Sequence, residues 1–387
     1  MFRRKSLFTV LLALIVSLSI LPLFKLEAHA ATVNASTLAE LQHAINDATD
    51  ATEIVLTADI PLTATVTVPS GKDITLSGGF TLTRTNSAIA FDIKEGASFT
   101  WQDIILDGNT QDTNYKSAVI NNQGKLTING GEIKNVRSNA GMAGIVMAKG
   151  PNAVLTMNGG SIHDNYMSNQ FTSVVKIIEG ASFVMNGGDI SNNTLEHGGS
   201  NGLNAAVSVE GNRGSSTMEM NGGTITGNSA EYGGILVGTF STNYTLSNNF
   251  SNPAHYYSTG TLKLNGGTIS NNTAATLGGG IAINGTGKLI MEGGTISGNK
   301  APFGGGIGVN DYLTSADGRG YGEARWRGFF PAAATINGGL ITGNEATMTA
   351  VTSQISDPNA ENGVGGGLYV ASKEVYVNGG QFTNNTA

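Results

Sequence analysis

Cysteine is absent from this chain of 387 residues. A protein without disulfides must take its stability from a packed core and from backbone hydrogen bonds. Charge is also scarce: only 13% of the residues are charged, and the formal net charge is −7. Nucleic acids and anionic membranes repel an acidic chain, so we expect no nucleic-acid partner.

Long apolar runs are equally rare, and the single clear one lies at positions 7–23. Three basic residues precede it at positions 3–5, and the A-x-A sequence Ala28-His29-Ala30 follows it. These flanks favour a signal peptide over residues 1–30 rather than a transmembrane anchor. We therefore expect a secreted or cell-surface protein. Nothing later in the chain is long and apolar enough for membrane insertion, and no cysteine is present for a lipoprotein anchor.

Glycine, by contrast, is abundant, with 55 residues. Low charge and high glycine content are typical of disorder, but here glycine is periodic. Nine Gly-Gly pairs start at Gly78, Gly130, Gly159, Gly187, Gly222, Gly266, Gly293, Gly338 and Gly379. The shortest spacings are 27–29 residues; the longest, 52, is close to two units, and the others fit one unit plus an inserted loop. A period in this range predicts a solenoid.

The segment 278–299 shows how one repeat is expected to fold. It contains three short stretches of alternating apolar residues, which are joined by Gly and Asn corners. Such strands lack a return hairpin, so they pair with their copies in the next repeat. The fold class predicted is all-β: a right-handed parallel β-helix of about 27 residues per coil, with three parallel sheets.

Aligned on the Gly-Gly pairs, apolar residues form continuous rows, which predict a stacked interior. Two residues before the pairs stand Leu76, Ile128, Met157, Met185, Met220, Leu264, Met291, Ile336 and Val377. After most pairs an Ile follows, and six residues after the first Gly stand Asn165, Asn193, Asn228, Asn272, Asn299, Asn344 and Asn385. We interpret this Asn column as a ladder of stacked amides at a corner, where Asn adopts the left-handed conformation.

A helix is predicted before the coils. Thr37 to Glu40 is a capping box, and apolar residues at helical spacing continue to about residue 50. We therefore divide the mature chain into an N-terminal segment, 31–52, with a capping helix, and a β-helix over 53–387. Because the sequence stops within a repeat, we expect the β-helix to be truncated at its C-terminal side.

Several repeats carry the sequence GGGI or GGGL, at 278–281, 304–307 and 365–368, and the last repeat ends in Phe382-Thr-Asn-Asn385. These repeats resemble those of bacterial right-handed β-helix surface proteins, including adhesin-like proteins and polymorphic outer-membrane proteins. The wider pectate-lyase-like group shares the coil. The resemblance implies an adhesin or a scaffold that binds carbohydrate or a host surface. The alternative it implies is a polysaccharide lyase or a glycoside hydrolase.

Two inserted segments, about 240–258 and 311–331, are expected to leave one corner of the coil with a single normal repeat between them. Their aromatic and cationic side chains suit stacking on sugar rings and binding of acidic groups. The candidate ligand-binding residues are Tyr256, Tyr257, Arg325 and Trp326. The partner expected is a polysaccharide or the surface of a host or neighbouring cell. Alternatively, these aromatic residues only anchor the segments to the coil.

Catalytic residues are not identified from the sequence. Enzymes of this fold use Asp clusters, often with Ca²⁺ or a basic residue, whereas Glu132, Asp189 and Glu219 stand alone. Histidines show no ligand spacing, so we expect no metal and no cofactor. Thr224, Thr226 and their equivalents in the next two repeats form a small hydroxyl array, which we interpret as a solvated β face because flanking repeats interrupt it.

Overall fold

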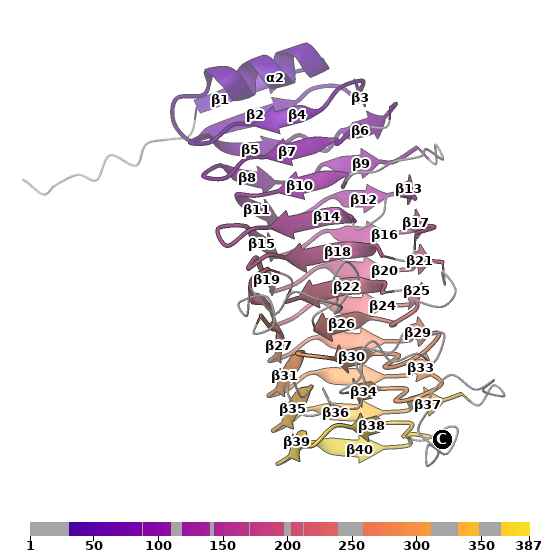
Figure 1. Ribbon diagram of the computed structural model, residues 1–387. Coiled ribbons are helices and arrows are strands. Elements are labelled where there is room, and N and C mark those ends of the chain that lie inside the picture. The colour runs from indigo at the N-terminus through magenta and orange to yellow at the C-terminus, as the bar shows by residue number, and fades with distance from the viewer. Residues whose placement is uncertain are drawn as a thin grey trace, which may run out of the picture.

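The computed structural model describes residues 31–86, 88–109, 118–139, 143–169, 171–196, 203–211, 213–238, 258–310, 332–347 and 365–387. These residues form one α-helix and four parallel β-sheets, which run side by side along a stack of coils (Figure 1). The all-β solenoid predicted from the repeats is confirmed. Within the described ranges, none of the helices has the length and hydrophobicity needed to span a bilayer.

The four sheets are named A to D here, and their strands are given in sheet order. Sheet A contains β1 (Ala31–Ala35), β2 (Thr52–Leu56), β5 (Asp73–Ser77), β8 (Ser98–Trp101), β11 (Lys125–Ile128), β15 (Val154–Met157), β19 (Ser182–Met185), β23 (Ser216–Met220), β27 (Gly260–Leu264), β31 (Lys288–Met291), β35 (Ala333–Ile336) and β39 (Glu374–Val377). Sheet B contains β3 (Ile60–Leu62), β6 (Thr81–Arg84), β9 (Ile105–Asp107), β12 (Glu132–Lys134), β16 (Ser161–His163), β20 (Asp189–Ser191), β24 (Thr224–Thr226), β28 (Thr268–Ser270), β32 (Thr295–Ser297), β36 (Leu340–Thr342) and β40 (Gln381–Thr383).

Sheet C contains β4 (Val66–Val68), β7 (Phe91–Ile93), β10 (Ile120–Asn122), β14 (Gly144–Lys149), β18 (Ser173–Ile178), β22 (Ala205–Glu210), β26 (Ile235–Gly238), β30 (Ile281–Asn284), β34 (Ile307–Asn310) and β38 (Leu368–Ala371). Sheet D contains β13 (Arg137–Ser138), β17 (Tyr166–Met167), β21 (Thr194–Leu195), β25 (Ser229–Ala230), β29 (Thr273–Ala274), β33 (Lys300–Ala301) and β37 (Glu345–Ala346).

One full coil visits the sheets in the order A, B, D, C, as β27, β28, β29 and β30 do. The prediction of three sheets was therefore wrong, because sheet D is a fourth. The strands of sheet D are only two residues long, and two residues are too few to show an alternating pattern in the sequence.

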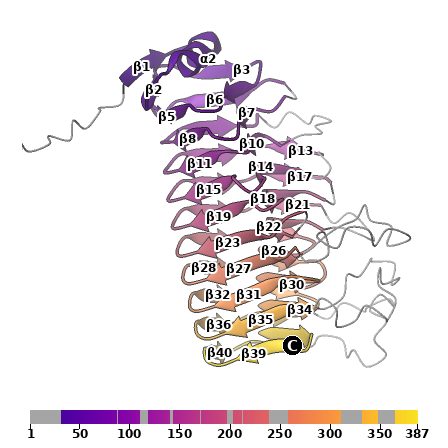
Figure 2. The same ribbon diagram turned by 60° about the vertical axis from the view of Figure 1, so that its left-hand side comes forward.

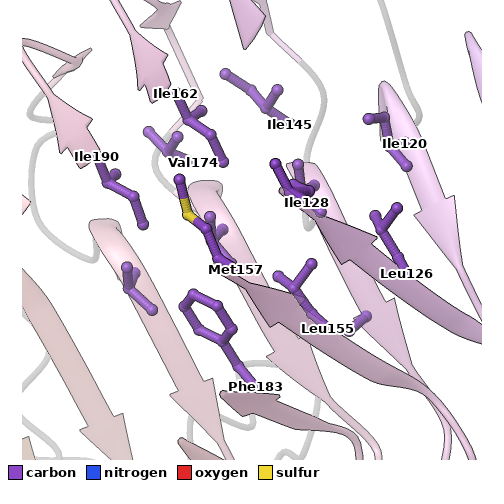
Figure 3. Packing of buried hydrophobic residues seen from close by; sticks show 14 of the residues in the cluster. Ile120, Leu126, Ile128, Ile145, Leu155, Met157, Ile162, Val174, Phe183 and Ile190 are labelled. Atoms are coloured by element: carbon purple, nitrogen blue, oxygen red, sulfur yellow. The ribbon is translucent and has the colours of Figure 1, made fainter. Parts of the chain in front are cut away.

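The register of sheet A confirms the predicted apolar rows. Ile128, Met157 and Met185 pair in successive coils and are each at most 3% exposed. Sheets A, B and C all point such residues into one interior, as Figure 3 shows for Leu155, Ile162 and other residues of the cluster. The 52-residue gap between Gly-Gly pairs holds an additional coil, since β8 lies between β5 and β11.

The repeat motif follows from the corner between sheets A and B. A Cβ on Gly222 would lie 2.4 Å from the main-chain oxygen of Asn186 in the preceding coil, so only glycine allows this approach. Gly223 has φ of +80°, which glycine adopts without strain. Ile225, in β24, then points into the core. The Gly-Gly pair thus lets each coil stack tightly while the chain turns.

The Asn column lies at the next corner, between sheets B and D, and its amides do stack. The left-handed conformation, however, falls one residue before the column, at Asn192 (φ +53°), Gly227 (φ +65°) and Asn271 (φ +54°). The prediction that the column residues themselves turn the chain was therefore wrong. Their side-chain amides instead form hydrogen bonds with one another between successive coils.

The predicted N-terminal helix is present as α2 (Leu38–Asp47), which lies at the first end of the stack (Figure 1). Thr37 Oγ1 accepts a hydrogen bond from the Glu40 amide at 3.2 Å, and Glu40 accepts one from the Ser36 amide at 2.8 Å. The Ser36 bonds hold the pKa of Glu40 below its ordinary value. Leu41 and Ile45 are fully buried against the core.

Candidate ligand-binding face

The predicted loop site is only partly located by the structure. Tyr256, Tyr257, Arg325 and Trp326 lie outside the described residues. The strands from which their segments leave are described: β26 and β34 lie on either side of β30 in sheet C. The prediction of one corner with a single normal repeat between the two segments is therefore confirmed, while the role of the four side chains stays a prediction.

The solvent face of sheet B carries an unbroken column of hydroxyl groups. Six successive strands, β20 to β40, place Ser191, Thr226, Ser270, Ser297, Thr342 and Thr383 in register. Figure 2 shows the last four of these strands stacked along one edge of the molecule. Thr226 Oγ1 lies 3.0 Å from Ser270 Oγ, and Thr383 donates to Thr342 at 2.8 Å. We call these six residues the hydroxyl column.

This column is longer than the array seen in the sequence. Ser191 extends it by one coil toward the N-terminus, and Thr342 and Thr383 extend it by two coils toward the C-terminus. Ser191 is buried, Thr383 is exposed and the four between are half-buried. On the N-terminal side the interruption is real, because Lys134 and His163 precede Ser191 in the same register. On the C-terminal side the interruption falls in the other outward column of sheet B, at Leu340 and Gln381.

A row of mostly exposed amides runs parallel to the hydroxyl column at the corner between sheets A and B, with the other outward column of sheet B between them. Each residue stands directly before a Gly-Gly pair, and each Nδ2 donates to the preceding coil. The row consists of Asn129, Asn158, Asn186, Asn221, Asn265, Asn337 and Asn378, with donor–acceptor distances of 2.7–3.1 Å. Gln102 accepts at its start, and Glu292 interrupts it between Asn265 and Asn337. We call it the outer amide ladder; the sequence analysis did not identify it.

Charge divides the face of sheet B into two parts. Its N-terminal part carries Glu132, Lys134 and His163, in which Lys134 pairs with Glu132 and His163 Nε2 lies 3.8 Å from Glu132. The hydrogen bond from Lys134 holds the pKa of Glu132 below its ordinary value. From β20 onward the outward positions of sheet B hold one charged residue, Asp189. Asp189 Oδ1 accepts from Thr224 at 2.6 Å.

The part from β20 onward therefore offers a hydroxyl in every coil, and an amide in every coil except that of Glu292, at a spacing of about 4.8 Å. Both groups donate and accept hydrogen bonds, as sugar hydroxyls also do. A fixed, one-dimensional array of this kind suits an extended, uncharged polymer of repeating polar units. Among the described residues, no group of three or more His, Cys, Asp or Glu side chains is arranged to hold a metal ion.

A separate acidic side chain, Glu231, lies just after β25 and is 6% exposed. Its amide donates to Asn204 Oδ1 at 2.7 Å, and its carbonyl accepts from Thr276 Oγ1 at 2.9 Å, so its backbone is fixed. Burial raises the pKa of the Glu231 carboxyl to about 7. The pKa of the adjacent Tyr232 is also raised, mainly by burial and secondly by the charge of Glu231. Glu231 is thus able to donate or accept a proton near neutral pH. The sequence did not indicate this property, because Glu231 stands there as a single acidic residue.

No protein-family model, no curated protein and no solved structure matches this chain.

Proposed function

We propose that this protein is an exported β-helical scaffold that binds a neutral polysaccharide on a host or neighbouring cell surface. The observation that carries the proposal is the hydroxyl column beside the outer amide ladder, because it presents identical polar groups over six coils. Export with loss of residues 1–30 is compatible with the fold, since all described strands of sheet A follow that position. Cleavage after residue 30 would leave sheet A intact.

Binding along this face is tested by removing hydroxyl groups without changing shape. Thr226→Val and Thr342→Val together delete two outward hydroxyls and keep β-branched side chains. The matched control is Thr127→Val with Thr156→Val, two paired residues on the outward face of sheet A. We expect the sheet B variant to bind a soluble neutral glucan about thirtyfold more weakly, because each of the two lost hydrogen bonds contributes about 1 kcal/mol. Equal binding by both variants would move the site away from sheet B.

The charge of the ligand is tested on the same protein. The neutral stretch of sheet B predicts stronger binding to the glucan than to polygalacturonate, which repels an acidic chain. If the predicted residues Arg325 and Trp326 form the site instead, polygalacturonate should bind at least as well, and Trp326→Ala with Tyr257→Ala should weaken binding about tenfold or more.

The alternative function, a polysaccharide lyase or a glycoside hydrolase, is favoured by one observation: a buried carboxyl, Glu231, with a pKa near neutrality. Incubation with neutral and acidic glycans separates the two functions. New reducing ends or unsaturated products that disappear in Glu231→Gln would establish the enzyme. Intact glycans after prolonged incubation would exclude the enzyme and support the function of a binding scaffold.

A further inference from the structure

One ion pair among the described residues is sequestered from water. Lys176 Nζ lies 2.6 Å from Glu210 Oε1, and the two side chains are 6% and 5% exposed. In every other described pair at least one side chain is more than a third exposed. The pair therefore differs from the rest in its environment.

The pair joins two adjacent coils on the outward side of sheet C. Lys176 of β18 is in register with Ser208 of β22, and Glu210 lies two residues further along β22. Ser208 is fully buried and its hydroxyl donates to Glu210 Oε1 at 3.1 Å. Lys176 Nζ also donates to the Phe171 carbonyl at 3.2 Å. An amine, a carboxyl and a hydroxyl thus meet in one dehydrated site.

Such a site favours condensation of the amine with the carboxyl. Two buried charges carry a desolvation penalty that their attraction offsets only in part, whereas an amide is neutral. Groups held in contact react with effective molarities on the order of 10⁵–10⁸ M, provided that their geometry is right. Exclusion of water also opposes the reverse hydrolysis.

We propose that Lys176 and Glu210 form an intramolecular amide bond. A proton passes from Lys176 Nζ to the Glu210 carboxylate, which leaves a neutral amine and a carboxylic acid. The nitrogen lone pair attacks Cδ of Glu210, and a tetrahedral intermediate forms. The Ser208 hydroxyl relays the second nitrogen proton to the departing hydroxyl group. One N–C bond forms, one C–O bond breaks and one water molecule leaves, with no change of oxidation state.

The link would tie neighbouring coils covalently in a chain that has no cysteine. It would close residues 176–210 into a ring, which restricts the unfolded chain as a disulfide does. The inference is independent of the proposed ligand, because the site lies on sheet C and the hydroxyl column lies on sheet B.

Peptide mass spectrometry of the purified full chain tests the bond directly. Between positions 150 and 213, Lys176 is the only internal trypsin site. If the amide exists, trypsin releases residues 150–213 as one peptide, lighter than its sequence by one water molecule. A glutamate-specific protease then cuts after Glu179 and Glu196 and leaves the pieces that contain Lys176 and Glu210 joined. Separate linear peptides 150–176 and 177–213 of full mass would overturn the proposal.

Two variants and one internal pair serve as controls. Lys176→Arg keeps the positive charge but cannot form the amide, so its peptides should be linear. Glu210→Gln removes the carboxylate that accepts the first proton from Lys176, so its peptides should be linear as well. Lys149 and Glu179, 3.6 Å apart and partly exposed, should stay unlinked. A link at Lys149 as well would indicate non-specific crosslinking and would overturn the assignment to the buried site.

Discussion

Two ladders of asparagine run along the later coils of this molecule, from Asn129 and from Asn165 onward, and they differ in burial. In the inner amide ladder, formed by the Asn column between sheets B and D, Asn228 is 1% exposed. Its Nδ2 donates to Asn272 Oδ1 and to the Ile190 carbonyl, both at 2.9 Å. Its Oδ1 accepts from the amide and the side chain of Asn193, at 3.0 and 2.8 Å. Every hydrogen-bonding group of this side chain has a partner.

The outer amide ladder contains Asn221 of the same coil, which is exposed. Asn221 donates once, to Asn186 at 2.9 Å, and accepts once, from Asn265 at 2.7 Å. The two ladders also run in opposite directions, because inner amides donate toward the C-terminus and outer amides toward the N-terminus. One residue type therefore holds the coils together on the inside of one corner and lies exposed to solvent on the outside of another.

The largest loss of stability is expected when a charge is placed on the side of a strand that faces the core. Ile269 is fully buried, and Ile269→Asp should lower the free energy of unfolding by more than about 4 kcal/mol, because an unpaired charge enters the core. Ser270, the next residue of β28, lies on the outward side and is half-buried, so Ser270→Asp should cost about 1 kcal/mol or less. Urea unfolding followed by circular dichroism measures both; equal losses would contradict the assignment of inside and outside.

Asn272→Asp tests the direction of the inner amide ladder. The carboxylate could still accept from Asn228 but could not donate to Asn299 Oδ1 or to the Ile225 carbonyl. We expect a loss of about 3–5 kcal/mol at pH 7. Burial would raise the pKa of this aspartate above its unfolded value, so part of the stability should return as the pH falls. A loss that does not depend on pH would contradict a buried position.

Glu231 predicts a pH dependence of the wild-type protein. Its pKa is about 7 in the folded protein, whereas the ordinary value for a glutamate is 4.5. Between these values the folded state binds a proton that the unfolded state has released, so stability falls as the pH rises through this window. The group accounts for a decrease of up to about 3 kcal/mol. Unfolding of the wild type and Glu231→Gln at pH 5 and pH 8 should show this decrease in the wild type alone.

The smallest effect is expected at the gap in the outer amide ladder. Glu292 accepts from Asn337 at 3.0 Å but has no N–H with which to donate to Asn265. Glu292→Asn would join the two parts of the ladder and should raise the free energy of unfolding by only a few tenths of a kcal/mol, because the bond is exposed to water. A gain above about 1 kcal/mol would mean that the outer ladder is structural.

The sequence predicted the coil, its apolar rows and the inner Asn column because Gly-Gly pairs fix the register of sheets A and B. It failed where the register depends on segments of variable length. Lys176 stands 11 residues before Gly187, whereas Ser208 stands 14 before Gly222, although the two pair directly. Counting from the glycines therefore cannot bring Lys176, Ser208 and Glu210 together.

The outer amide ladder was missed, and the hydroxyl column was recognised only in part, for a different reason. Exposed positions tolerate many residues, so Glu292 and His163 obscure the pattern in the sequence, and only the paired strands show which residues are neighbours. The predicted site at Tyr256 and Trp326 lies outside the described residues and stays a prediction.

The most direct test compares Asn228→Ala with Asn221→Ala, the inner and outer amides of one coil, by urea unfolding of the same purified chain. Asn228→Ala leaves the Asn193 amide and the Ile190 carbonyl without these bonds and should cost about 3 kcal/mol or more. Asn221→Ala should cost less than about 0.5 kcal/mol. Similar losses for the two variants would contradict the claim that position across the coil wall decides what each asparagine does.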